Sequence, residues 1–231
     1  KNRRKLKKAG CLYLRTGMAG NAHAALANAL KPENRNINKG LELWNKALDE
    51  FTASKCPLSV ISSECFVESQ RIPDVLALAA KRKDIKIQVL VYLRDQPSWI
   101  QSVFNEVVKD PMRRFTGNVF DLREYRLGRL NYYDTLSPWA NWLGDENIRL
   151  RAFNKASLKK ANPIVDFIDA ISDRHFFPVH DNDLKGLITN ASMPVPISEF
   201  LRRCNLLSMQ IGDHQRLVNA LQGVSENAQQ W

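Results

Sequence analysis

The chain has 231 residues, of which 44% are hydrophobic and 25% are charged, and its formal net charge is +10. This length and composition suit one soluble α/β domain with a full hydrophobic core, and they exclude a small scaffold that needs disulfide staples. No run of residues is long and apolar enough to predict a transmembrane helix. The cysteines form no CxxC pair, so they predict neither a metal site nor a disulfide framework, and they favour a reducing cytoplasm: Cys11, Cys56, Cys65 and Cys204.

The positive charge is concentrated at the start of the chain. Lys1 to Lys8 hold six basic residues and no acidic one, which leaves only +4 for the rest of the sequence. A basic run of this kind is most often a solvated helix face. The charge therefore does not favour a nucleic-acid partner, although a non-catalytic module that binds nucleic acid or an anionic glycan stays open as the alternative to an enzyme.

Helices and strands are predicted to alternate along the chain. Apolar residues at helical spacing predict helices over 39–53, 73–81, 97–109, 121–128, 132–143, 163–172, 199–209 and 214–221. Short apolar or alternating runs predict strands over 58–62, 87–93 and 147–153. This alternation indicates an α/β fold with three layers, in which helices flank a central parallel sheet. We see no domain boundary, so residues 1–231 are predicted to form one domain.

The segment from Ile87 to Ser102 carries the strongest functional signal. A dense apolar run, typical of a strand covered on both faces, ends at Arg94, and Pro97 then begins a helix that carries Ser102. Ligands of open α/β sheets bind at the carboxyl ends of the strands. A guanidinium and a hydroxyl placed there suit a phosphate group. The alternative is an arginine that ends a strand and pairs with a surface carboxylate.

A family resemblance rests on this segment. Leu93-Arg94-Asp95-Gln96-Pro97, with Ser102 eight positions after the arginine, resembles the 3′-phosphate-binding segment of sulfotransferases. These enzymes use 3′-phosphoadenosine 5′-phosphosulfate, called PAPS below, as sulfate donor. The resemblance implies a P-loop-NTPase-like sulfotransferase fold, PAPS as cofactor, and Arg94 and Ser102 as ligands of its 3′-phosphate.

Four further segments are similar to a bacterial subgroup of that family. They are Ala9 to Gly17, Asn21-Ala22-His23 with Leu26-Ala27, Ile61 to Phe66, and Asn190-Ala191-Ser192 with Glu199 to Asn205. The subgroup acts on sugars or polysaccharides. The resemblance therefore implies transfer of a sulfuryl group from PAPS to a hydroxyl of a carbohydrate or a related acceptor.

One part of the family pattern is missing. The subgroup begins with a strand and a lysine-containing loop that holds the donor's 5′-phosphosulfate, and Met18-Ala19-Gly20-Asn21 lacks the lysine and the following Ser or Thr. We expect the natural protein to be longer by a few tens of residues, with the missing segment supplying this loop and a central strand. A deleted, inactive relative is the alternative.

Sulfuryl transfer also needs a base that takes the proton of the acceptor hydroxyl. Glu64 follows the strand over 58–62 and is one candidate, although an acidic residue there also suits the start of a helix capped by Ser62 or Ser63. His23 titrates near neutral pH and is the other candidate, although a single histidine flanked by alanines is often only a packed side chain.

Overall fold

The structure is a computed structural model that describes residues 2–82, 85–172 and 193–228. It is a mixed α/β structure in which helices predominate and two small sheets contain two strands each. Contacts group the chain into two compact units, residues 1–92 with 132–179 and residues 93–131 with 180–231. Sequence analysis indicated no boundary. Among the described residues, the chain passes from one unit to the other inside a strand and again between two adjoining helices. No Pro- or Gly-rich linker marks either of these places.

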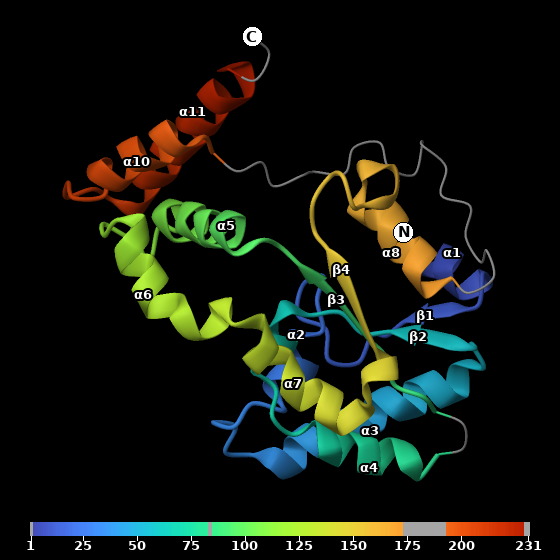
Figure 1. Cartoon of the computed structure of the whole chain (residues 1–231). Coiled ribbons are helices and arrows are strands. Elements are labelled where there is room, and N and C mark those ends of the chain that lie inside the picture. The colour runs from blue at the N-terminus through green and yellow to red at the C-terminus, as the bar shows by residue number, and fades with distance from the viewer. Residues whose placement is uncertain (1, 83–84, 173–192, 229–231) are drawn as a thin grey trace. The chain divides into compact units, whose positions relative to one another are not determined.

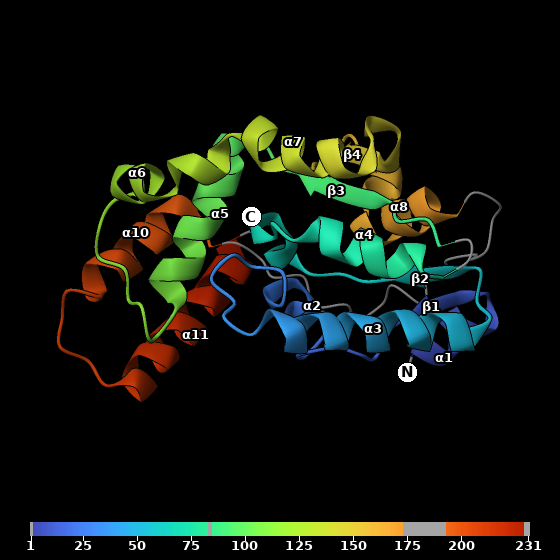
Figure 2. The ribbon, with the colours of Figure 1, turned by 90° about the horizontal axis from the view of Figure 1, so that it is seen from below.

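The first unit contains most of the elements shown in Figures 1 and 2. They are α1 (Asn2–Lys8), β1 (Cys11–Tyr13), α2 (Ala24–Asn28), α3 (Ile37–Ser54), β2 (Leu58–Val60), η1 (Glu64–Glu68), α4 (Ile72–Ala80), β3 (Val89–Leu93), α7 (Tyr132–Leu143), η2 (Asp145–Asn147), β4 (Ile148–Ala152), η3 (Lys159–Ala161) and α8 (Pro163–Ile171). Leu93, the last residue of β3, is assigned to the second unit.

The sheets of the first unit differ from the single central sheet that the sequence predicted. In one sheet β1 pairs in parallel with β2, with Cys11 opposite Leu58 and Tyr13 opposite Val60, and in the other β3 pairs with β4. Among the described residues no strand joins the two sheets by hydrogen bonds. The strand β3 was predicted to be covered on both faces, but all five of its residues are only half-buried. Both faces of β3 are therefore partly covered, and neither is fully buried.

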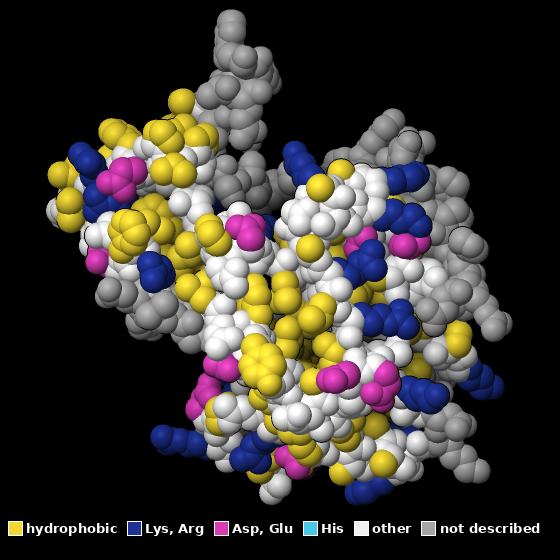
Figure 3. All heavy atoms as spheres, in the orientation of Figure 1, with side chains coloured by type: hydrophobic (Ala, Val, Ile, Leu, Met, Phe, Trp, Pro, Cys, Tyr) yellow, Lys and Arg dark blue, Asp and Glu magenta, His cyan; other side chains and the backbone are white. Residues whose placement is uncertain are grey.

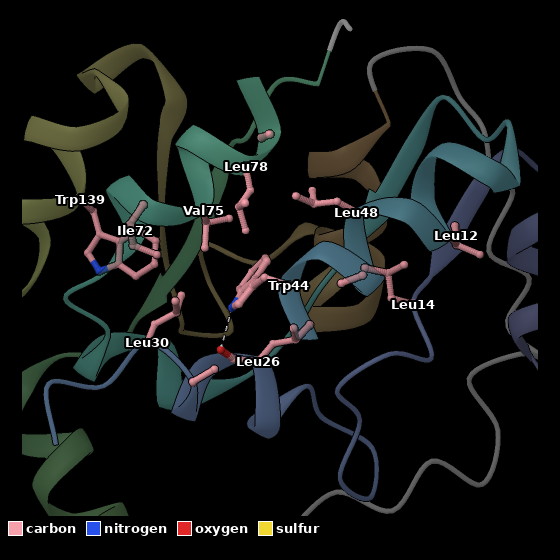
Figure 4. Close-up of a cluster of buried hydrophobic side chains, with 13 residues drawn as sticks. Leu12, Leu14, Leu26, Leu30, Trp44, Leu48, Ile72, Val75, Leu78 and Trp139 are labelled. Carbon is pink, nitrogen blue, oxygen red and sulfur yellow. Dashed lines mark hydrogen bonds between the residues drawn. The ribbon is translucent and has the colours of Figure 1, made fainter. Parts of the chain in front are cut away.

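The core of the first unit lies between β1, α2, α3, α4 and α7. Trp44 of α3 lies at its centre, and its indole N–H donates to the carbonyl oxygen of Leu26 at 3.0 Å, as Figure 4 shows. Leu26 in turn lies against Gly17, whose φ is +77°. A Cβ at Gly17 would lie 2.4 Å from Cγ of Leu26. Only glycine fits there, because both the backbone conformation and the space exclude a side chain.

A buried ionic network joins β3, β4 and α8. The Asp166 carboxylate of α8 is fully buried and accepts hydrogen bonds from the Tyr92 hydroxyl at 2.7 Å and from Nε and Nη2 of Arg151 at 2.5 and 2.7 Å. The backbone N–H of Lys159 donates a further bond at 2.9 Å. Arg151 chiefly holds the pKa of Asp166 far below its usual range, whereas burial and the bond to Asp166 raise the pKa of Tyr92. The network is fully paired, so it suits a structural role.

The second unit is helical and contains α5 (Gln96–Lys109), α6 (Val119–Leu130), α10 (Val195–Cys204) and α11 (Ile211–Ala228). Its core is a second apolar cluster formed by Ile100, Phe104, Val107, Val108, Leu122, Met193, Leu201 and Val218. Figure 3 shows further hydrophobic side chains in the region of α10 and α6. Phe120 of α6 and Phe200 of α10 are exposed. No helix of the described residues combines the length and the apolar character that a membrane span requires.

The helix predicted over 199–209 lies earlier in the chain than expected, because α10 spans Val195–Cys204. Pro194 and Pro196 flank its first residue, and prolines fit a first helical turn. Beyond its end, the Arg114 guanidinium donates to the carbonyl oxygens of Leu207 and Met209 at 2.5 and 2.9 Å. These side-chain bonds satisfy carbonyls that a longer helix would have paired internally.

Candidate functional site

The turn between β3 and α5 has the form that the sequence predicted. The strand ends at Leu93, Arg94 follows, and the Asp95 carboxylate caps the helix by accepting from the backbone N–H of Ser98 at 2.9 Å. The helix begins at Gln96, with Pro97 in its first turn. That hydrogen bond chiefly lowers the pKa of Asp95, and the positive charge of Arg94 adds a smaller contribution. Asp95 thus acts chiefly as the helix cap, and the pairing of Arg94 with a surface carboxylate stays a prediction.

Arg94 and Ser102 both belong to the second unit and are both half-buried. Ser102 lies seven residues after the capping Asp95, which corresponds to two helical turns and about 10 Å along the axis. Residues seven apart lie on the same helix face. Ser102 is therefore on the face of α5 that begins at its cap residue, Asp95.

Two amide side chains of α5 were not singled out from the sequence. Nε2 of Gln101 and Nδ2 of Asn105 are buried, and neither has a hydrogen-bond partner among the described residues. The two residues are four apart, so they are neighbours on the helix surface. Buried N–H groups almost always have a partner. Oδ1 of Asn105 accepts from the hydroxyl of Ser198 on α10, so the Asn105 amide belongs to the core of the second unit. Nε2 of Gln101 is therefore the donor on α5 that suits an anionic ligand, and an unpaired buried amide can be recognised only from the structure.

His23 is fully buried and ties together the ends of β1 and β2. Its Nε2 lies 3.0 Å from the carbonyl oxygen of Leu14, and its Nδ1 accepts from the backbone N–H of Ser62 at 3.0 Å. The His23 backbone N–H also donates to the Ser62 carbonyl at 2.7 Å. Because Nδ1 is an acceptor, Nε2 carries the proton and donates it to Leu14. Both ring nitrogens are held by backbone groups, and this geometry favours the packed-residue reading of His23.

Glu64 is the first residue of η1, and its side chain is exposed. The hydroxyl of Ser63 caps this short helix by accepting from the backbone N–H of Cys65 at 3.2 Å. Glu64 therefore lies at the start of a short helix capped by Ser63, and its role as a base stays a prediction. Glu64 and Arg94 follow β2 and β3, and these two strands belong to different sheets.

The four predicted site residues thus fall into two groups. His23 and Glu64 lie in the first unit, at the carboxyl ends of β1 and β2. Arg94 and Ser102 lie in the second unit, Arg94 just before α5 and Ser102 in the middle of this helix. Within the described ranges, no three His, Cys, Asp or Glu side chains are placed to hold a metal ion. The Asn190-Ala191-Ser192 segment lies outside the described residues.

A carboxylate that the sequence analysis passed over shapes the loop after β1. Glu50 of α3 accepts from the backbone N–H of Arg15 at 2.9 Å, and from the N–H and hydroxyl of Thr16 at 2.9 and 2.7 Å. Burial alone would raise the pKa of Glu50, but these hydrogen bonds outweigh it and the pKa lies below its ordinary value. Glu50 therefore fixes the start of the loop that leads to Gly17 and His23.

We expect Glu50→Gln to lower the free energy of unfolding at pH 7 by about 1–2 kcal/mol, because an amide replaces a charged acceptor. The pKa of Glu50 is lower in the folded state than its ordinary value of 4.5. Its contribution is therefore fully present above that value and is lost as the pH falls through the folded pKa. Urea unfolding of both proteins at pH 7 and pH 3 measures this. A difference that persists undiminished at pH 3 would contradict the assignment.

Comparisons with known proteins give one partial match. A protein of Archaeoglobus fulgidus, described as an uncharacterized protein, is 29% identical over 115 residues, which cover 48% of this chain and 29% of that relative. The chain thus spans less than a third of that protein's length. No family model matches the chain, and no solved structure matches it. The residues of the chain itself therefore carry the functional argument.

Proposed function

We propose that this chain belongs to a PAPS-dependent sulfotransferase with a P-loop-NTPase-like fold, which acts in the cytoplasm on a hydroxyl of a carbohydrate or related acceptor. The observation that carries the proposal is the turn from β3 into α5. There Arg94 follows the last strand residue and Ser102 lies on the helix face that begins at the Asp95 cap. The mixed α/β architecture and the parallel pairing of β1 and β2 are compatible with such a fold.

Arg94 and Ser102 are assigned to the 3′-phosphate of the donor. A guanidinium offers paired N–H groups to two phosphate oxygens, and a hydroxyl donates to a third. The half-burial of both residues strengthens such bonds, because water competes less for them. The buried Nε2 of Gln101 is a further donor on the same helix.

The reaction transfers a sulfuryl group without a metal ion. A base takes the proton of the acceptor hydroxyl, the acceptor oxygen bonds to sulfur, and the bond from sulfur to the 5′-phosphate oxygen breaks. The products are a sulfate ester and 3′-phosphoadenosine 5′-phosphate. Glu64 is preferred over His23 as the base, because its carboxylate is exposed whereas both ring nitrogens of His23 are held by backbone groups.

Binding of the desulfated donor, 3′-phosphoadenosine 5′-phosphate, tests the assignment in the complete natural protein. Arg94→Ala is expected to weaken this binding by about 10- to 100-fold, because a charge-assisted phosphate contact is lost, and Ser102→Ala by about fivefold. Calorimetric titration measures both. Adenosine 5′-phosphate lacks the 3′-phosphate and should bind more weakly than the desulfated donor. Its affinity should be the same for Arg94→Ala and for the unmodified protein.

Arg113→Ala is the matched control, because Arg113 is an exposed arginine of the same unit and pairs with Asp110. It should bind the desulfated donor normally. If Arg94→Ala and Arg113→Ala behave alike, Arg94 is not a phosphate ligand. If the protein does not bind the desulfated donor and instead binds heparin or nucleic acid, the non-catalytic alternative replaces the enzyme.

A further inference from the structure

The beginning of α11 is held by a buried polar cluster at Asn205, the residue that follows α10. Nδ2 of Asn205 donates to the carbonyl oxygens of Val108 at 3.0 Å and Phe115 at 3.2 Å. Oδ1 of Asn205 lies 2.9 Å from Nε2 of His214, which belongs to α11 and is fully buried. The His214 ring therefore ties the start of α11 to the ends of α10 and α5.

This geometry fixes where the His214 ring carries its proton. Because Nδ2 of Asn205 is the donor to both carbonyls, its Oδ1 is an acceptor, and Nε2 of His214 donates to it. Nδ1 of His214 is buried and has no hydrogen-bond partner among the described residues. A neutral ring has only a lone pair at Nδ1, whereas a protonated ring places an N–H group and a full charge there. The site therefore suits the neutral ring.

The charges around the ring also oppose a second proton. Arg114 holds the loop between α10 and α11, because its guanidinium donates to three backbone carbonyl oxygens of that loop. Burial and, after it, the positive charge of Arg114 lower the pKa of His214, and the Val108 carbonyl and Asp110 oppose them with smaller effects. The charged residues on either side of the ring along α11 pair with each other at the surface: Asp213 and Arg216.

We propose that His214 is a pH-sensitive latch, and that protonation of its ring releases α11 from α5 and α10 as the pH falls below about 6. Further along the helix, α11 packs through apolar side chains, Leu217, Val218 and Leu221, against the second apolar cluster. Its release therefore uncovers apolar side chains of α5 and α10. The latch goes beyond the proposed transferase activity and does not depend on it, because none of these residues is assigned to PAPS.

The direction of the pH effect follows from the two states of α11. When α11 is released, the His214 ring lies in water with its ordinary pKa of 6.5, whereas the pKa in the packed state is lower. The released state therefore binds a proton between these two values, and acid favours it. At pH 7.5 the ring is neutral in both states. At pH 5.0 the equilibrium constant for release rises by up to about 30-fold, the limit that an ordinary pKa of 6.5 sets.

Hydrogen exchange of the α11 amides in the complete natural protein tests the latch. We expect the opening equilibrium of residues 215–224, corrected for the intrinsic pH dependence of exchange, to rise by about 10- to 30-fold between pH 7.5 and pH 5.0. His214→Gln is the decisive variant, because its amide can still donate to Asn205 but takes up no proton. Its opening equilibrium should be the same at both pH values, even if opening is more frequent overall.

A titration of the His214 ring, followed by NMR through its Cε1 proton, keeps the test decisive if His214→Gln does not fold. In the unmodified protein, ring protonation and opening of α11 should share one midpoint, below pH 6.5. The proposal is overturned if acid opens α11 in His214→Gln as strongly as in the unmodified protein, because another group then drives the release. A ring that takes up its proton while α11 stays protected from exchange would overturn it equally.

Discussion

Replacing Asp166 by alanine is expected to lower the free energy of unfolding by roughly 3–5 kcal/mol, the largest stability effect of any single change discussed for this chain. The carboxylate is fully buried and accepts bonds from Tyr92, Arg151 and the backbone of Lys159. Its loss leaves the guanidinium and the tyrosine hydroxyl without their acceptor, between β3, β4 and α8. Urea unfolding at pH 7, followed by circular dichroism, measures the effect.

Asp169→Ala is the matched control, since Asp169 also lies on α8 and pairs with Lys159, but its side chain is 42% exposed. Exposed ion pairs contribute little, so a loss below about 1 kcal/mol is expected. Tyr92→Phe removes one hydrogen bond and should cost about 1–2 kcal/mol. Similar small losses for Asp166→Ala and Asp169→Ala would show that the buried network does not hold β3 and β4 to α8.

The largest expected effect on activity is at Glu64. If Glu64 takes the acceptor proton, Glu64→Gln should reduce turnover by ~10²–10⁴-fold and leave binding of the desulfated donor unchanged. Release of 3′-phosphoadenosine 5′-phosphate from PAPS, measured with carbohydrate acceptors in the complete natural protein, gives the rate. Glu42→Gln, at an exposed glutamate of α3, is the control and should be fully active.

His23→Gln distinguishes the two candidate bases. Its ring links the ends of β1 and β2, so we expect lost turnover to be accompanied by a lower unfolding temperature. A variant that folds normally, binds the desulfated donor and has lost turnover would assign the base to His23 instead. Activity that survives both Glu64→Gln and His23→Gln would place the base elsewhere in the protein.

The sequence predicted the longer elements of the fold well, because their signals are local. The helix predicted over 39–53 is α3 at Ile37–Ser54, and the helix predicted over 132–143 is α7 at Tyr132–Leu143. The helical spacing of apolar residues and the capping residues involve positions only a few residues apart, so both can be recognised in the sequence. In contrast, β1 and α2 have three and five residues, too few for any period to emerge.

Contacts between distant residues carry no such signal. Glu50 meets Thr16 across 34 residues, and Tyr92 meets Asp166 across 74. A partial clue exists for Asp166, because it lies between Val165 and Phe167 on a mostly apolar helix, and a buried acid there needs a cationic partner. The turn at Arg94 was predictable since strand, cap and helix are contiguous. The division of the described strands into two sheets was not predictable, because pairing between strands depends on the whole sheet.

The contact between Gly17 and Leu26 affects how genetic variation in this protein should be interpreted. Any substitution at Gly17 forces a side chain into Leu26, which lies at the base of the Trp44 cluster. Such an allele would abolish function. Because Gly17 lies in the loop that Glu50 holds and that leads to His23, the loss could be mistaken for the loss of a catalytic residue. Its cause would be a shortage of folded protein. Cellular abundance should therefore be measured before a damaging variant in this loop is attributed to catalysis.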